Sequence, residues 1–286
     1  MYRHYDLAVP QESHSLDLPP FPVPPLSVPL GGRLSHFVDN WATLTQDSFI
    51  LDVLRYGYKI QFTEPPPLTC NPVPTVLNLP ATQQTALDSE IQTFIDNHVI
   101  EQVSDLSTPG FYSKTFVRPK KDSGEWRCII DLSLLNKYIL HIPFKMETTN
   151  SIRMSLNEQE YVFTLDLKNA YNHVLVHPSS RKYLRFFWYN KCYQFRGLCF
   201  GLKTAPWIFS RLVAEVAKHF HSRFIFSHFF LDDWLFRNLM YAILLNQQHY
   251  VLQVTEALGW IVNYDKSNLT LCQIFNYFII CLLQEK

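Results

Sequence analysis

Proline is unevenly distributed along this chain, and that distribution limits where a packed domain can form. Thirteen of the 18 prolines lie within the first 80 residues, including Pro19-Pro20, Pro24-Pro25 and the triplet at 65–67. Because proline fixes φ and removes a backbone donor, residues 1–30 are predicted to be an extended arm. The chain has 286 residues, so the part beyond the prolines is still long enough to bury a large core.

The spacing of apolar residues predicts the order of the helices and strands. Within residues 31–80, Leu34, Phe37, Trp41 and Leu44 recur at helical intervals. From residue 81 the pattern predicts helices over 82–98, 205–219 and 240–258. It predicts strands over 111–117, 126–132, 161–167, 183–188 and 192–195, a hairpin around 232, and a short strand that begins at 261. This order predicts an α+β fold in which helices back an antiparallel sheet.

Composition restricts the functional class only weakly. The chain is 47% hydrophobic and 15% aromatic, and its formal net charge is zero, so any nucleic-acid binding requires a local basic patch. The six cysteines match no zinc spacing and are expected to be free thiols. The N-terminus lacks the apolar core of a signal peptide, and no apolar run reaches 18 residues. These features predict an intracellular chain, cytoplasmic or nuclear, with no membrane partner.

Two adjacent carboxylates, Asp232 and Asp233, interrupt an apolar and aromatic run that extends from Phe224 to Phe236. A charge in such a run is costly to bury unless it is paired or binds a metal. A solvated hairpin turn is the alternative, but such turns usually contain Gly, Asn or Pro rather than Leu and Trp. We therefore expect a tight turn that presents both carboxylates at one end of a sheet.

Asp166 ends another apolar strand and supplies a third carboxylate; the alternative is an ordinary strand-end or N-cap residue. If Asp166 lies beside Asp232, the two can bridge two divalent ions, an arrangement that catalyses in-line phosphoryl displacement. Mg²⁺ prefers such carboxylates together with water, and Mn²⁺ is expected to substitute. Tyr171 follows five residues later and is placed to lie against the sugar of a nucleotide, unless it is simply a core aromatic.

Three further segments carry candidate phosphate-binding groups. Lys120, Lys121 and Arg127 flank a polar connection that can fold over a triphosphate, although surface lysines in a solvated turn are the simpler explanation. Gly201 precedes a helix that starts near Pro206, where close backbone approach and a helix N-terminus favour an anion. Lys266 follows a turn, where it can protonate leaving pyrophosphate or remain an exposed lysine.

Taken in order, these segments resemble the palm and fingers of reverse transcriptases over about residues 91–280. The stretch 120–127 resembles the fingertip hairpin whose lysine and arginine contact the triphosphate. Asp166 with Tyr171 resembles motif A, with its metal ligand and its gate against ribonucleotides. The segment from Phe200 and Gly201 to Pro206 resembles motif B, which lines the nucleotide and template pocket. Residues 230–233 resemble the Tyr-x-Asp-Asp box. Lys266 falls at the position of the motif D lysine. The form Leu-Asp-Asp-Trp and the segment 31–37 look most like DIRS-type, tyrosine-recombinase retrotransposons.

The resemblance implies an RNA-directed DNA polymerase with a right-hand fold, fingers at about 81–160 and palm at about 161–286. It implies that Asp166, Asp232 and Asp233 bind two Mg²⁺ ions, and that the partners are a template-primer and a deoxynucleoside triphosphate. Phe230 replaces the usual tyrosine, and residues 277–280 lack the glycine expected near the primer grip. The thumb is expected to be truncated or absent, and ribonuclease H and recombinase modules to be encoded elsewhere in the parent element. Two alternatives are an inactive truncated remnant that only binds nucleic acid and an unrelated two-metal nuclease.

Overall fold

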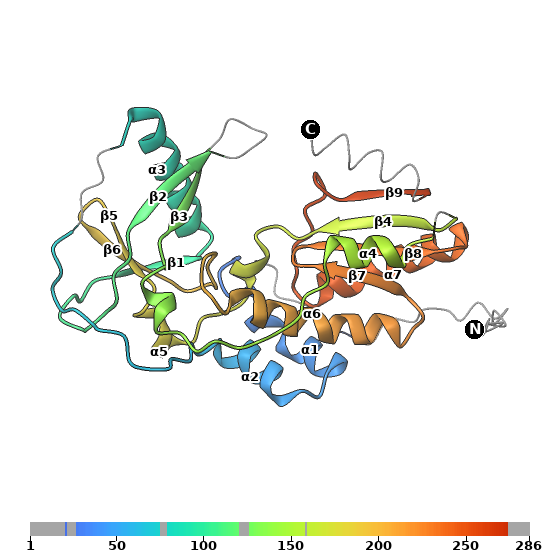
Figure 1. The fold of residues 1–286 in the computed structure, drawn as a ribbon, viewed down its shortest axis with the longest axis horizontal. Helices are drawn as coiled ribbons and strands as arrows, with labels where there is room; N and C mark the ends of the chain where they lie inside the picture. The colour runs from blue at the N-terminus through green and yellow to red at the C-terminus, as the bar shows by residue number, and fades with distance from the viewer. Residues whose placement is uncertain (1–20, 22–26, 75–78, 120–125, 158, 274–286) are drawn as a thin grey trace.

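The computed structural model describes residue 21 and residues 27–74, 79–119, 126–157 and 159–273. Two lobes lie side by side, and the N-terminal helices pack below their junction (Figure 1). The predicted extended arm falls almost wholly outside the described residues, and so does the segment near the primer grip at 277–280.

One lobe is built on a four-stranded antiparallel sheet in the order β7-β8-β4-β9. The strands are β4 (Tyr161–Asp166), β7 (Phe226–Phe230), β8 (Asp233–Asn238) and β9 (Asn268–Gln273). The helices α6 (Ala205–His221) and α7 (Tyr241–Ala257) pack against this sheet. Phe163 and Phe236 stack at 4.8 Å between ring centroids on neighbouring strands. The predicted antiparallel sheet backed by helices is confirmed.

The other lobe holds a three-stranded antiparallel sheet in the order β1-β6-β5, beside the hairpin β2–β3. Its elements are α3 (Ala81–Asp96), β1 (Ile100–Val103), β2 (Thr115–Pro119), β3 (Trp126–Ile130), β5 (Arg185–Trp188) and β6 (Lys191–Phe195). Helix α3 packs against β3. The tip of the β2–β3 hairpin, with Lys120 and Lys121, lies outside the described residues.

The chain passes between the lobes more than once, so a single boundary at residue 160 does not separate the residues of one sheet from those of the other. After β4 the chain leaves the four-stranded sheet and forms β5 and β6, and β6 pairs with β1 from Ile100↔Phe195 to Val103↔Cys192. It then returns along α6 to form β7 and β8. Strands β5 and β6, which fall in the segment expected to be palm, therefore belong to the sheet that contains β1.

The N-terminal helical segment packs on the loop that follows α7. It comprises the 3-10 helix η1 (Arg33–Phe37), α1 (Val38–Leu44) and α2 (Ser48–Tyr56). Trp41 Nε1 donates to the carbonyl of Leu258 at 2.9 Å, and Arg33 Nε donates to that of Gly259 at 2.8 Å. Helix ends leave carbonyls without intrahelical partners. The N-terminal segment therefore caps the C-terminal end of α7 and fixes the start of the next loop.

Short elements connect the lobes: η2 (Leu135–Lys137), α4 (Thr149–Ser155), η3 (Ala170–His173) and α5 (Pro178–Arg181). A hydrophobic core runs through both lobes and includes Trp41, Ile91, Phe209 and Trp260. The short strand predicted from residue 261 is a single bridge between Val262 and Leu167, and the next strand, β9, begins at Asn268. Among the helices in the described part of the chain, none is both long enough and apolar enough to span a membrane.

Candidate active site

The two adjacent carboxylates lie at a two-residue turn between β7 and β8. Phe230 pairs with Asp233, so Leu231 and Asp232 form the turn. Leu231 has a φ of 54°, a left-handed conformation that is unfavourable for a branched residue. Its carbonyl accepts a hydrogen bond from Trp234 Nε1 at 3.1 Å, and its side chain packs against the core. Backbone strain of this kind persists where surrounding contacts hold it, and it concentrates at functional sites.

Asp166 lies at the same end of the sheet as the Asp-Asp pair. It lies directly opposite Asp233 in the register of β4 and β8. The backbone N–H of the next residue, Leu167, donates to the carbonyl of Asp232 at 3.0 Å. Three carboxylates from two strands and a turn therefore gather at one end of the four-stranded sheet.

The charges at this end of the sheet repel one another. Burial, and then the carboxylates of Asp232 and Asp166, raise the pKa of Asp233 to about 6, while Lys266 opposes the shift. Burial also raises the pKa of Asp166, against a hydrogen bond from Asn263. Asp233 keeps contact with solvent, which screens part of the repulsion. The site therefore carries negative charge that the nearby Lys266 offsets only in part.

Oxygen ligands and excess negative charge suit a hard divalent cation. In the described part of the chain, no three His, Cys, Asp or Glu side chains converge closely enough to form a complete metal cage. Mg²⁺ is usually held by one or two carboxylates together with substrate phosphates and water, so a partial site fits this ion. The carboxylates of Asp166, Asp232 and Asp233 are the oxygen donors at this end of the sheet.

Tyr171 forms a wall beside the carboxylates. It lies in η3, which follows β4, and its ring contacts Phe200 at 4.7 Å and Phe209 at 5.3 Å between centroids. Burial and then the charge of Asp232 raise the pKa of Tyr171 to about 12, so its hydroxyl stays protonated at neutral pH. Tyr171 is only 6% exposed whereas Phe200 is 52% exposed, so Phe200 is the ring that faces solvent.

Gly201 adopts a φ of 89°, and an added Cβ would meet only the carbonyl of Ile130, at 3.5 Å. This position therefore needs glycine for its backbone conformation. Asn136, which the sequence did not single out, fixes the same turn from both sides. Its Nδ2 donates to the carbonyl of Gly201 at 2.8 Å, and its Oδ1 accepts from the N–H of Lys203 at 2.9 Å.

Of the four predicted cationic residues, the structure places Lys266 and Arg127, and they lie in different parts of the fold. Lys266 is exposed and lies near enough to lower the pKa values of Asp166 and Asp233. Arg127 lies on β3, opposite Arg118 in the β2–β3 hairpin. Lys120 and Lys121 fall outside the described residues, so their predicted contact with a triphosphate stays a prediction.

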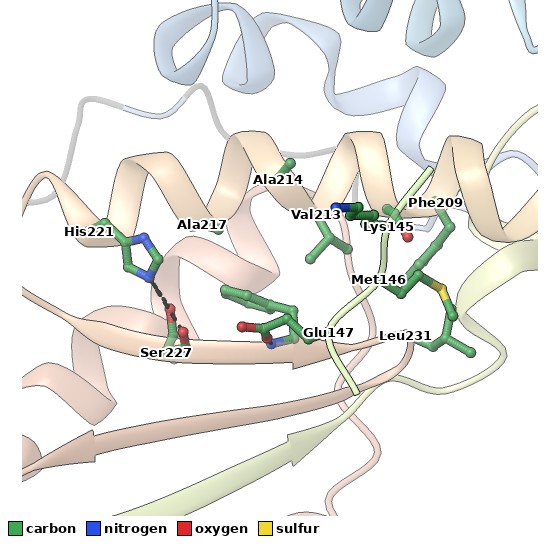
Figure 2. A pocket seen from close by; sticks show the side chains of 12 residues that line it. Lys145, Met146, Glu147, Phe209, Val213, Ala214, Ala217, His221, Ser227 and Leu231 are labelled. Atoms are coloured by element: carbon green, nitrogen blue, oxygen red, sulfur yellow. Dashed lines mark hydrogen bonds between the residues drawn. The ribbon is translucent and has the colours of Figure 1, made fainter. Parts of the chain in front are cut away.

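A pocket of about 190 Å³ lies between α6 and β7, and the segment Lys145–Glu147 crosses it (Figure 2). Glu147 accepts a hydrogen bond from the N–H of Phe229 at 2.8 Å and contacts His228 at 3.0 Å. Leu231 lines the pocket, but none of the three aspartates does. The pocket is therefore separate from the carboxylate site, and Glu147 satisfies a backbone donor on β7, an edge strand of the sheet.

Carboxylates on a strand end and a neighbouring hairpin therefore lie beside a buried aromatic residue at one end of the four-stranded sheet. Residues 118–280 match the family model described as reverse transcriptase (RNA-dependent DNA polymerase). The chain belongs to this family.

Relatives and solved structures agree with this assignment. The chain is 25% identical over 205 residues to the retrovirus-related Pol polyprotein from transposon 412 of Drosophila melanogaster, a match that covers 71% of the chain and 16% of that polyprotein. It is 30% identical over 120 residues to the Pro-Pol polyprotein of simian foamy virus type 1, covering 42% of the chain and 10% of that protein. The foamy viral protease-reverse transcriptase in complex with an RNA/DNA hybrid has a TM-score of 0.59 at 18% identity, covering 86% of this chain and 34% of that one. The chain thus spans about a sixth of the transposon 412 polyprotein, and the structural likeness establishes the fold.

Proposed function

We propose that this chain is the polymerase module of a retroelement and synthesises DNA on an RNA or DNA template by two-metal nucleotidyl transfer. The observation that carries the proposal is the register of β4 and β8, which sets Asp166 opposite Asp233 while Asp232 is joined to Leu167 by a backbone hydrogen bond. Family membership supports the same reaction.

In the proposed reaction the 3′-hydroxyl of the primer loses its proton to water, its oxygen forms a bond to the α-phosphorus of a deoxynucleoside triphosphate, and the bond from that phosphorus to pyrophosphate breaks. Asp166 and Asp232 would hold two Mg²⁺ ions, and Asp233 would support them. When bound, such ions activate the attacking oxygen and stabilise the leaving one. Lys266 would give a proton to the departing pyrophosphate.

Other residues would position the nucleotide. Lys120, Lys121 and Arg127 would contact the triphosphate, while Phe200 and Gly201 would shape the nucleotide pocket. The buried Tyr171 ring, held by Phe200 and Phe209, would exclude a ribose 2′-hydroxyl. In this assignment the lobe built on β4, β7, β8 and β9 acts as palm, and the lobe with β2 and β3 acts as fingers.

We further propose that the parent element is of the DIRS type, with ribonuclease H and recombinase modules encoded elsewhere in it, and that the protein works in the cytoplasm or nucleus. The Leu-Asp-Asp-Trp sequence and the segment 31–37 support the subgroup. Arg33 of that segment donates a hydrogen bond to the carbonyl of Gly259 in the loop after α7, which fits a role within the polymerase.

Primer extension tests the function. With poly(rA)/oligo(dT), dTTP and Mg²⁺ or Mn²⁺, the wild-type chain should extend the primer and Asp232→Asn should not. Asp52→Asn, a surface change on α2, controls for an unrelated loss of charge. Extension that survives Asp232→Asn contradicts the proposal. A dTTP-dependent footprint without extension would identify an inactive binder, and Mg²⁺-dependent cleavage without dTTP would identify a nuclease.

A further inference from the structure

Asn263 lies in the loop between α7 and β9 and binds Asp166 twice. Its side-chain Nδ2 donates to Asp166 Oδ1 at 2.7 Å, and its backbone N–H donates to the carbonyl of Asp166 at 2.8 Å. The two residues are 97 positions apart in the sequence, so the contact depends on the fold. A paired contact of this kind fixes both the strand end and the direction of the carboxylate.

The loop that carries Asn263 is itself held in place. Ser267 Oγ accepts from the N–H of Asp166 at 3.0 Å and donates to the carbonyl of Asn263 at 2.8 Å. The N–H of Lys168 donates to the carbonyl of Ile261 at 2.9 Å. Loop and strand end are therefore joined on both sides of Asp166, and the Asn263 amide has little freedom to move.

An amide suits this position better than a carboxylate. Asp166 already lies opposite Asp233 in the register of β4 and β8, and the carbonyl of Asp232 accepts a hydrogen bond from the next residue, Leu167, so a further carboxylate here would add to the negative charge. Asn263 adds a donor without adding charge. Because Oδ1 accepts this bond, while no hydrogen bond within the described part of the chain reaches Oδ2, the two oxygens of Asp166 are not equivalent.

We propose that Asn263 is a positioning residue for the metal ligand Asp166: it holds Oδ1 so that Oδ2 is presented to a divalent cation. The inference rests on the proposed function, because it assigns the bound cation to the polymerase reaction. Residues that orient a metal ligand typically contribute about 10- to 100-fold to metal affinity or activity.

Three variants test this role. Asn263→Ala removes the donor, and Asn263→Asp keeps the side-chain shape but replaces the donor with a fourth carboxylate. Asn268→Ala is the matched control, because Asn268 begins β9 on the same edge of β4 and its Oδ1 accepts from Thr270 rather than contacting Asp166. For each protein we would measure the Mg²⁺ concentration for half-maximal primer extension and the KM for dTTP at saturating Mg²⁺. Mn²⁺ binding would be measured by electron paramagnetic resonance in the complex with dideoxy-terminated primer-template and dTTP.

We expect Asn263→Ala to raise the Mg²⁺ requirement and weaken Mn²⁺ binding by about 10-fold or more. Asn263→Asp should be affected at least as strongly, while the KM for dTTP at saturating Mg²⁺ changes little and Asn268→Ala behaves as wild type. Mn²⁺ binding is normalised to the folded fraction from thermal melts, so a loss of stability alone leaves it unchanged. Wild-type cation affinity in both Asn263 variants overturns the inference while the polymerase function stands. A wild-type chain that neither binds Mn²⁺ nor extends the primer overturns both.

Discussion

Asp166 and Asp233 occupy directly opposed positions on β4 and β8, so two carboxylates face each other across an antiparallel strand pair. Like charges at opposed positions destabilise a sheet. The turn residue Asp232 adds a third negative charge at the same end. The arrangement therefore costs stability in the absence of a cation, as expected where a site is built for binding rather than for folding.

The first prediction concerns how the loss of stability caused by these neighbouring carboxylates depends on pH. The pKa of Asp233 is raised from its ordinary value of 3.8 to about 6 in the folded protein, so the folded state favours the protonated acid. Its contribution to the free energy of unfolding is therefore full below about pH 4 and is lost as the pH rises through about 6. Asp233→Asn should melt at a higher temperature than wild type at neutral pH, and the difference should shrink toward pH 4.

Thermal melts at intervals from about pH 4 to pH 8 measure this difference, with Asp52→Asn as the surface control. Added Mg²⁺ should raise the melting temperature of the wild type above pH 6 more than it raises that of Asp233→Asn. If Asp233→Asn melts at a lower temperature than wild type at neutral pH, Asp233 stabilises the fold in the absence of added Mg²⁺, which contradicts the prediction.

The second prediction concerns His173, which is fully buried in η3. Burial lowers its pKa from 6.5 to about 3. Its Nε2 accepts from the N–H of Ile261 at 3.2 Å, and its Nδ1 lies 3.2 Å from the carbonyl of Ala170, which fits the neutral ring protonated on Nδ1. Stability from this group is present above about pH 6.5 and is lost as the pH falls toward 3, because the unfolded chain binds the extra proton.

His173→Gln should therefore flatten the acid side of the stability curve between about pH 6.5 and pH 4, even if it lowers stability at neutral pH. Urea denaturation at several pH values gives the slope. His249→Gln, at an exposed position of α7, is the control. If the slope of the unfolding free energy against pH is unchanged in His173→Gln, another group causes the acid sensitivity. His219 is the first candidate, because burial lowers its pKa to about 4.

Local sequence patterns predicted most of the palm sheet and its helices. The hairpin that carries Asp232 and the strand that ends at Asp166 were predicted because each is an apolar run bounded by polar residues. The pairing of β6 with β1 was not predicted, because pairing between strands about 90 residues apart leaves no local signal. Helix α4 and strand β1 were also missed, since each is too short to show a period.

The charged residues of the candidate site could be predicted from the sequence, whereas the residues that form hydrogen bonds around them could not. Adjacent aspartates in an apolar run stand out, whereas an asparagine in a loop does not. Asn263 and Asn136 form hydrogen bonds with partners 97 and 65–67 residues away, so these contacts are visible only in the folded chain. Asn263 lies three residues before Lys266, and that proximity to a predicted site residue was the one available signal.

The third prediction concerns discrimination between sugars. Tyr171→Ala should gain ribonucleotide incorporation, because the ring that would meet a 2′-hydroxyl is removed, whereas Tyr171→Phe should keep the discrimination. Phe200→Ala should show a smaller gain, because Phe209 still packs against the Tyr171 ring when Phe200 is removed. The ratio of kcat/KM for rUTP and dTTP measures the effect. Wild-type discrimination in Tyr171→Ala would remove Tyr171 from the gate.

The fourth prediction separates backbone strain from crowding at two glycines. Gly259 and Gly201 have nearly equal φ values, 92° and 89°, so alanine at either position is strained by about 1–2 kcal/mol. At Gly259 an added Cβ would also lie 2.5 Å from the Phe37 ring, whereas at Gly201 the nearest atom is 3.5 Å away. Gly259→Ala should therefore lower the free energy of unfolding more than Gly201→Ala, as measured by urea denaturation. Equal losses of unfolding free energy in the two variants would show that Phe37 moves aside for the added Cβ. The N-terminal segment would then not hold the loop that leads to Asn263.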